Sequence, residues 1–250
     1  MTRFHTALIA AALLGAAAVG AGSYSWLGVV VVGLLILIGF GVAMPQLSFF
    51  GTYVCRGDDS QRCVALTFDD GPDPRSTPAL LDLLRTEMIE AAFFCIGAKV
   101  ATEGELTARI AQEGHLLGNH TFNHSHTTNF FSVARLQEEL TRTQTAIHEA
   151  AGVAPKHFRP PVGLSNPRTF RAARAVGLKV IGWSVRSLDT RITEPERIVA
   201  RIVRKLEPGA IILLHDGNIP AERLVVTMKL LLAKLRERGY VVVRLDRMLS

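Results

Sequence analysis

The sequence predicts an α/β fold built on a parallel sheet, behind an N-terminal membrane segment. Past residue 63, short apolar runs rich in β-branched residues alternate with longer amphipathic runs, and Gly, Pro or Asn stands at most junctions. Alternating strands and helices give a parallel sheet, either open or closed into a barrel. The length of 250 residues suits one catalytic domain plus an accessory segment.

The N-terminal segment contains no Asp, Glu, Lys or Arg between Phe4 and Val54. Two apolar blocks lie within it, at residues 7–22 and 27–44. The second block is long enough to cross a hydrocarbon core as a helix. The first block fits either a second, weaker membrane helix or the apolar part of a signal peptide.

We expect residues 1–50 to hold the protein in the cell (inner) membrane and residues 55–250 to form a catalytic domain on its extracytoplasmic side. Charge does not fix this orientation. Arg3 precedes the apolar blocks, and Arg56 and Arg62 follow them among acidic neighbours that offset their charge.

The sequence contains three cysteines, and a disulfide between two of them would indicate that the domain lies in an oxidising compartment. Cys55 and Cys63 flank a short polar loop, and they either form a disulfide, if this loop faces an oxidising compartment, or remain free thiols. Cys95 lies inside an apolar run, which predicts a position in the core.

Seven segments of the domain are expected to be strands and six to be helices. The expected strands are residues 64–68, 92–96, 116–119, 157–159, 178–185, 210–214 and 240–245. The expected helices are residues 78–87, 98–112, 132–151, 167–176, 195–206 and 221–238, several of which open with Pro.

The net charge of +6 comes almost wholly from the domain. Most of its Lys and Arg residues fall on helical stretches, which predicts solvated helix surfaces. A basic surface drawn to lipid head groups or a lipid-linked phosphate is the alternative. No nucleic-acid motif accompanies the charge, so we expect no nucleic acid partner.

Side chains suited to catalysis follow five of the expected strands. They are Asp69 and Asp70 after the first strand, His120 after the third, Arg159 at the fourth, Asp189 after the fifth and His215 after the sixth. The carboxyl ends of parallel strands share one edge, where α/β enzymes place their active sites. The sequence therefore predicts one site built from these residues.

Asp69 and Asp70 form the centre of this predicted site. Two adjacent buried carboxylates need a nearby cation or a shared proton, although Asp-Asp-Gly-Pro is also an ordinary solvated turn. His120 and His124 stand four residues apart, so on a helix they share one face. With one carboxylate they form a His₂Asp ligand set of the kind that holds catalytic Zn²⁺.

Arg159, Asp189 and His215 complete the predicted site. Arg159 stands before two prolines, on a stiff loop that suits a cation fixing a carboxylate, with a structural salt bridge as the alternative. His215 ends a buried strand, where an imidazole can act as a general acid, and Asp189 can orient it. His115 and His126 do not match the ligand spacing, and we expect them on the surface or in a supporting position.

These motifs resemble those of the NodB-type polysaccharide deacetylases, carbohydrate esterase family 4. The similarity spans residues 64–245. The Thr-Phe-Asp-Asp-Gly motif stands at residues 67–71, the His-Ser/Thr-x-x-His motif at 120–124, the Arg-Pro-Pro motif at 159–161 and the Leu-x-His motif at 213–215. The resemblance implies a distorted (β/α)₇ barrel, in agreement with the seven expected strands.

The resemblance also implies a role for each site residue. Asp69 would be the general base, positioned by Arg159, and His215 the general acid, tuned by Asp189. A divalent metal ion, Zn²⁺ by preference with Co²⁺ or Ni²⁺ as alternatives, would be held by Asp70, His120 and His124. The oxyanion hole would involve Pro161 and Val162, the latter through its backbone N–H.

Three residues depart from the family pattern. Val162 stands where the family usually has an aromatic residue, and Arg186 and Thr190 replace the first Asp and the Trp of the family's Asp-x-x-Asp-Trp motif. These changes affect the substrate groove and leave the catalytic set complete.

The resemblance implies a metal-dependent hydrolase that removes N-acetyl or O-acetyl groups from an amino-sugar glycan such as peptidoglycan or a chitin-like oligosaccharide. A deformylase or deacetylase of a lipid-linked sugar is one alternative, which would explain both the membrane segment and the altered groove. A catalytically inactive, membrane-bound glycan-binding module is the other.

Overall fold

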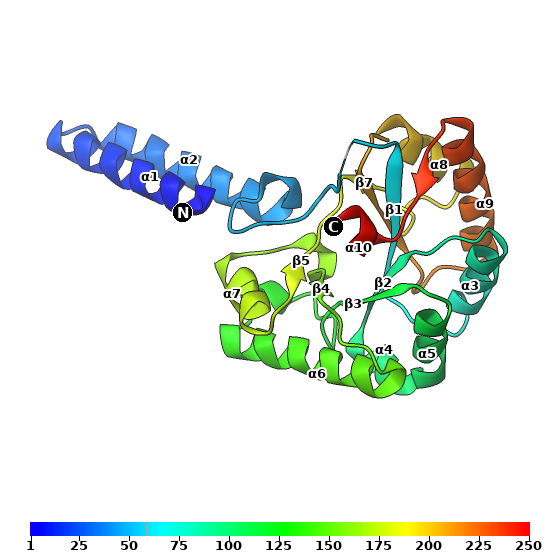
Figure 1. Cartoon of the computed structure of the whole chain (residues 1–250). Helices are drawn as coiled ribbons and strands as arrows, with labels where there is room; N and C mark the ends of the chain where they lie inside the picture. The colour runs from blue at the N-terminus through cyan, green and yellow to red at the C-terminus, as the bar shows by residue number, and fades with distance from the viewer. Residues whose placement is uncertain (59) are drawn as a thin grey trace.

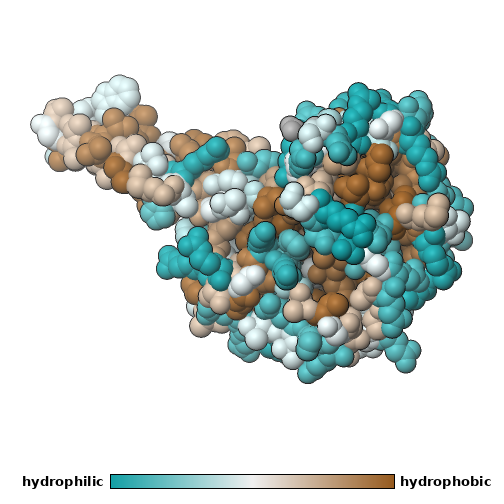
Figure 2. Space-filling view, in the orientation of Figure 1, coloured by the Kyte–Doolittle hydropathy of each residue, from teal (hydrophilic) through white to brown (hydrophobic). Residues whose placement is uncertain are grey.

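The computed structural model comprises an N-terminal helical hairpin and an α/β domain, and the structure describes residues 1–58 and 60–250 (Figure 1). The hairpin helices are α1 (Arg3–Gly20) and α2 (Tyr24–Ala43). Both are long and apolar enough to cross a membrane, and a signal sequence near the N-terminus would have the same character. Figure 2 shows apolar residues along the hairpin where it projects from the domain.

At the base of the hairpin, residues 3–4 in the first turn of α1 contact residues 47–50 after α2. The Phe4 N–H donates to the Phe49 carbonyl over 3.0 Å, and Arg3 Nη1 donates to the Leu47 carbonyl over 2.8 Å. The Phe4 ring also packs against the rings of Phe49 and Phe50. If both helices cross a membrane, the amino terminus and the domain therefore lie on the same side of it.

The domain is built on a sheet whose paired strands all run parallel. Its strands are β1 (Cys63–Asp69), β2 (Ala92–Cys95), β3 (Leu116–Asn119), β4 (His157–Phe158), β5 (Lys179–Val180), β6 (Val185–Arg186), β7 (Ala210–His215) and β8 (Val241–Val242). Their order is β5-β4-β3-β2-β1-β7-β6, with β8 also paired to β1. The α/β class with a parallel, barrel-like sheet is thus confirmed, and the sheet is a curled half-barrel.

The prediction of one strand over residues 178–185 is wrong. The chain there forms β5 and β6, which lie at opposite edges of the sheet because β5 pairs with β4 and β6 pairs with β7. Between them, the Gly182 carbonyl accepts a hydrogen bond from Arg159 Nη2 instead of from a strand. The domain therefore has eight strands among the described residues, where seven were expected.

The segment that follows the hairpin bridges the open side of the half-barrel. The Val54 N–H donates to the Val180 carbonyl, and the Val54 carbonyl accepts from the Gly182 N–H. Further along, the Gly57 N–H donates to the Gly209 carbonyl beside β7. This linker thus takes the place of a strand between β5 and β7.

Helices cover the outer face of the sheet (Figure 1). They are α3 (Thr77–Thr86), α4 (Gly97–Thr102), α5 (Gly104–Gln112), α6 (Val133–Ala151), α7 (Pro167–Ala175), α8 (Pro195–Arg204) and α9 (Ala221–Glu237), and α10 (Leu245–Met248) follows β8. The helix expected over residues 98–112 breaks at Glu103, whose ψ of 45° is not helical. The strand expected over 240–245 ends early because Leu245 opens α10.

Side-chain alternation along β1 separates two layers of core. Leu66 and Phe68 pack outwards beneath the helices, and Ala65 packs inwards with residues such as Trp183. Because strand residues alternate between faces, Thr67 and Asp69 also face the inside of the curl. Cys55, Cys63 and Cys95 are all free thiols, so the free-thiol alternative holds in this structure.

Candidate active site

Asp69 and Arg159 form the buried centre of the site. Arg159, which follows β4, is fully buried, and its Nη1 donates to Asp69 Oδ1 over 2.7 Å and to Thr67 Oγ1 over 2.8 Å. Its Nη2 donates to the Gly182 carbonyl. The structure thus places a fixed cation against the carboxylate of Asp69, as the sequence predicted.

Asp70 turns away from Asp69 because its φ of 71° lies in the left-handed region. Its Oδ1 lies 3.4 Å from His120 Nε2 and 3.2 Å from His124 Nε2. Ligand atoms of the three side chains all lie within 4.8 Å of one another. The structure therefore brings together the three residues predicted to hold a metal.

The donor set of Asp70, His120 and His124 fits a divalent metal. His120 Nδ1 lies 2.6 Å from the Arg159 carbonyl, which can only accept, so Nδ1 carries a proton and Nε2 of the neutral imidazole is the nitrogen that would bind a metal. Zn–N and Zn–O bonds of about 2.0–2.2 Å at tetrahedral angles separate ligand atoms by roughly 3.3 Å. The Nε2-to-Oδ1 distances of 3.4 and 3.2 Å match that spacing.

The prediction that His120 and His124 share a helix face is wrong. They lie in a loop after β3 in which Thr121 and His124 have φ values of 64° and 48°. The buried Glu139 carboxylate on α6 shapes this loop by accepting the N–H groups of Phe122 and Asn123. The imidazoles therefore meet through a loop held by a distant helix.

His215 ends β7 directly beside Asp69, with which it is paired across the sheet. Its Nδ1 lies 2.8 Å from Asp189 Oδ1, and its backbone N–H donates to Asp189 Oδ2 over 2.8 Å. Burial alone would lower the pKa of His215, but the hydrogen bond and charge of Asp189, with the charges of Asp69 and Asp70, raise it to about 9. This imidazole is therefore protonated at neutral pH.

Electrostatics set the metal-binding residues apart from His215. Burial lowers the pKa of His124 to about 4, helped by the charge of His120, so its imidazole is neutral and able to ligate. Burial would raise the pKa of Asp70, but the hydrogen bond from His120 and the charges of the surrounding histidines hold it well below its usual range. Burial would lower the pKa of His120, but the charges of Asp69 and Asp70 and the hydrogen bond to Asp70 raise it. The site thus combines the ionised carboxylate of Asp70, the neutral imidazole of His124 and the imidazolium of His215.

Pro161 and Val162 lie on a short 3₁₀ turn after β4. Val162 has a φ of 59°, which strains a β-branched residue, and its side chain is 46% exposed. The next residue, Gly163, packs on Trp183 so closely that a Cβ would lie 2.1 Å from the indole ring. The packing of Gly163 on Trp183 therefore constrains the backbone next to Val162.

Three residues that support the site were not predicted from the sequence to do so. Thr67 links Arg159 to the Ile212 carbonyl of β7. Glu139 lies on the buried face of α6, and an acidic residue on that apolar stripe was a usable signal. Asp216 is fully buried and accepts from Thr77 Oγ1, and Gly71 is required beside it because a Cβ there would lie 2.2 Å from Asp216 Oδ2.

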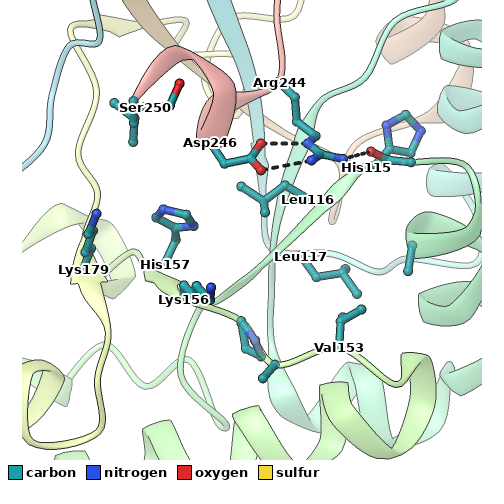
Figure 3. A pocket seen from close by; sticks show the side chains of 15 residues that line it. His115, Leu116, Leu117, Val153, Lys156, His157, Lys179, Arg244, Asp246 and Ser250 are labelled. Atoms are coloured by element: carbon teal, nitrogen blue, oxygen red, sulfur yellow. Dashed lines mark hydrogen bonds and ion pairs between the residues drawn. The ribbon is translucent and has the colours of Figure 1, made fainter.

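His115 and His126 lie outside the site. His126 is exposed, with its ring centroid 6.2 Å from that of His124. His115 is buried at the start of β3, at the opposite end of the sheet from Asp69, so the expectation of a surface or supporting position is wrong for it. There it lines a cavity of about 530 Å³, which also contains His157 and the Arg244–Asp246 ion pair (Figure 3).

Comparison with known proteins agrees with this geometry. Residues 56–181 match the family model described as polysaccharide deacetylase. The chain belongs to the polysaccharide deacetylase family. Asp69, Arg159, Asp189 and His215, which the motifs predict to be catalytic, end or follow strands β1, β4, β6 and β7 at one edge of the sheet.

Relatives within the family are named for two glycans. A peptidoglycan-N-acetylglucosamine deacetylase of Bacillus cereus is 36% identical over 184 residues, which covers 73% of this chain and 85% of the relative. A chitooligosaccharide deacetylase of Bradyrhizobium is 39% identical over 162 residues, covering 64% and 74%. The crystal structure of the Bc1960 peptidoglycan N-acetylglucosamine deacetylase superposes with a TM-score of 0.75 at 30% identity, covering 79% and 92%.

Family membership makes this chain a hydrolase of the polysaccharide deacetylase type, with relatives that support deacetylation of amino-sugar glycans.

Proposed function

We propose that this polysaccharide deacetylase hydrolyses the N-acetyl group of an amino sugar in peptidoglycan or a chitin-like oligosaccharide. The observation that carries the proposal is the arrangement along the sheet edge. Asp69 lies on the central strand β1, the His120–His124 loop follows β3 on one side, and His215 ends β7 on the other. A base, a metal-binding set and an acid thus surround one point.

We assign the metal site to Asp70, His120 and His124, with Zn²⁺ favoured by the ligand types and Co²⁺ or Ni²⁺ as alternatives. When bound, such a cation supplies Lewis acidity, which polarises an acetyl carbonyl and makes water more acidic.

Asp69 serves as the general base in this proposal. Arg159 donates a hydrogen bond to Asp69 Oδ1. The other carboxylate oxygen, Oδ2, lies on the side of His120, 3.8 Å from His120 Nε2. That oxygen faces the position at which water would attack an acetyl group, and it can accept the proton of that water. Arg159 both aims the carboxylate and stabilises its ionised form.

His215 serves as the general acid. Its Nδ1 is committed to Asp189, so its remaining nitrogen, Nε2, is the one that can deliver a proton to the leaving amine. The backbone N–H of Val162, next to Pro161, is assigned to the oxyanion that forms when the carbonyl is attacked. The contact of Gly163 with Trp183 supports this assignment because it constrains the turn that carries the donor.

The test uses the full chain in detergent, loaded with Zn²⁺. Acetate release is measured from N-acetylglucosamine oligomers and from peptidoglycan fragments, with Asp69→Ala and His215→Ala as inactive controls that still bind metal. Formate and acetate release from undecaprenyl-linked sugars is measured in parallel. Turnover only on the lipid-linked sugars would replace the proposal by the lipid-linked alternative, and full activity of either alanine variant would overturn the residue assignments.

We also propose that α1 and α2 insert in the inner membrane as a hairpin and leave the domain on the extracytoplasmic side, where peptidoglycan is found. Alkaline phosphatase fused after Ser250 is expected to be active in intact cells, because that enzyme matures only outside the cytoplasm. An inactive fusion at normal protein level, together with a fluorescent cytoplasmic fusion at the same position, would place the domain inside the cell and favour a substrate on the inner leaflet.

A further inference from the structure

Four arginines gather beside the His215–Asp189 pair, and we call them the arginine cluster: Arg186, Arg191, Arg201 and Arg223. Arg186 ends β6, and Arg201 on α8 donates from Nε to the Arg186 carbonyl over 3.0 Å. Arg223, in the first turn of α9, donates from Nη2 to the Asp189 carbonyl over 3.4 Å. The cluster therefore flanks the acid side of the active site.

Arg186 is the member nearest the reaction centre. It is half-buried, and its guanidinium carbon lies 5.7 Å from the centroid of the Trp183 ring. The same ring lies 5.9 Å from the guanidinium carbon of Arg159, which holds Asp69, and it packs against Gly163 next to Val162. Trp183 therefore contacts Arg186, the Arg159 that holds Asp69, and the turn that carries Val162.

The cluster has no ion-pair partner within residues 1–58 and 60–250. None of its four members forms a salt bridge there. Arg223 Nε is also buried without a hydrogen-bond acceptor among those residues. The nearby carboxylate of Asp189 already accepts from the His215 ring, the His215 N–H and Ser187 Oγ.

The charges around Arg186 also show an excess of positive over negative charge. Burial lowers the pKa of Arg186, the charges of Arg191 and Arg201 lower it further, and Asp189 alone opposes them. Half-buried like charges repel and are costly unless an opposite charge compensates them. Guanidinium groups bind carboxylate and phosphate oxygens in pairs of hydrogen bonds, so an oxyanion is the ligand that this cluster fits.

We propose that the arginine cluster binds a carboxylate or phosphate carried by the substrate, on the acetylated sugar or on the sugar next to it. The inference deepens the proposed function and rests on it for the identity of the reaction. It assigns the substrate to anionic glycans, and it gives Arg186, which replaces an acidic residue of the family motif, the role of recognising that charge.

The test compares three substrates with equal numbers of N-acetyl groups. They are tetra-N-acetylchitotetraose, which is neutral, its 1-phosphate, and a tetrasaccharide of alternating N-acetylglucosamine and N-acetylmuramic acid, which carries lactyl carboxylates. The wild-type enzyme is expected to show a higher kcat/KM on at least one charged substrate, and the preferred one distinguishes phosphate from carboxylate. Arg186→Gln should reduce the ratio of charged to neutral kcat/KM at least about tenfold, because a hydrogen bond to a charged group is lost.

Arg171→Gln is the matched control, since it removes the same charge from an exposed position on α7. It should leave the ratio unchanged, and Arg186→Lys should restore part of it. Equal kcat/KM on charged and neutral substrates in the wild-type enzyme, or an unchanged ratio in Arg186→Gln, would overturn the inference.

A binding assay separates this inference from the proposed function. The affinities of Asp69→Asn for N-acetylmuramic acid, N-acetylglucosamine 1-phosphate and N-acetylglucosamine are measured by calorimetry, with and without Arg186→Gln. Tighter binding of a charged sugar that depends on Arg186, in a protein whose wild type deacetylates none of the substrates, would refute the proposed function and retain the cluster as an anion site. Equal affinities for all three sugars would refute the cluster alone.

Discussion

The two ends of the sheet hold histidines in opposite electrostatic surroundings, one half-buried and the other buried. At the carboxyl ends of the strands, His215 lies against Asp189, and its pKa is raised to about 9. At the amino ends, His115 accepts one hydrogen bond from the Ala91 N–H, its Nε2 has no partner among the described residues, and burial lowers its pKa to about 4. Burial lowers the pKa at both ends, so the hydrogen bond and charge of Asp189, with the charges of Asp69 and Asp70, make the difference.

The backbone differs between the two ends as well. Among the described residues, eight that are not glycine have left-handed φ values, and six of them lie in loops at the carboxyl ends of strands: Asp70, Thr121, His124, Val162, Leu188 and Asn218. Such conformations cost free energy and persist where the surrounding structure enforces them. The comparison teaches that the strained backbone of the described residues is concentrated at the carboxyl ends of the strands, where polar contacts hold it, and that the loops at the amino ends contain little of it.

The largest expected effect comes from the catalytic end. Asp69→Asn should reduce kcat by at least about 10²–10⁴-fold, because the amide cannot accept the proton of the attacking water. Its oxygen can still accept from Arg159, so the protein should fold and bind one equivalent of metal. Acetate release and metal content per chain are the measurements, and near-normal turnover in folded Asp69→Asn would contradict the assignment.

Removal of a metal ligand should have the next largest effect. His124→Ala should weaken Zn²⁺ binding by at least about a hundredfold, since even groups that only support a ligand cost up to that much. His126→Ala is the control, because it changes an exposed histidine of the same loop. Competition with a chromophoric chelator measures both affinities, and equal losses in the two variants would assign the metal elsewhere.

The pair formed by Asp189 and His215 should control the basic limb of the pH profile. If His215 is the general acid, as proposed, activity requires its protonated form and should fall as pH rises through the pKa of that residue. Asp189→Asn removes the charge that raises this pKa, and the fall in kcat/KM should move to lower pH by at least about one unit. Ser187→Ala, which removes only one hydrogen bond to Asp189, should move it less. Identical profiles for Asp189→Asn and the wild-type enzyme would show that another group acts as the acid.

The smallest effect on activity is expected at the amino end of the sheet. The pKa of His115 is about 4 in the folded protein, below its value of about 6.5 in the unfolded chain. The neutral form is therefore favoured by folding, and its stabilisation is complete above pH 6.5 and lost as pH falls towards 4. His115→Asn, which keeps an acceptor for the Ala91 N–H, should flatten the fall of Tm with pH over that range.

Acetate release at pH 7 by His115→Asn should equal that of the wild-type enzyme. A loss as large as that of Asp189→Asn would mean that the two ends of the sheet are coupled, and the contrast between them would fail.

Much of the site could be predicted from the sequence because its motifs are local. Asp69 with Asp70, and His120 with His124, are close along the chain, and each follows an apolar run that forms a strand. The C-terminal edge of a parallel sheet then brings these runs to one place. The free state of Cys55 and Cys63 could not be predicted in this way, because their spacing allowed either outcome.

The sequence by itself determined the α/β class, the order of most strands and helices and the chemical types in the site, because periodicity and motif spacing are properties of neighbouring residues. Tertiary structure decided what depends on distant partners. Glu139 bends the His120–His124 loop away from a helix, and the competing neighbours β4 and β7 divide residues 178–185 into two strands. Tertiary structure alone also shows which arginines lack a carboxylate, since a charge acquires or misses its partner only when the chain has folded.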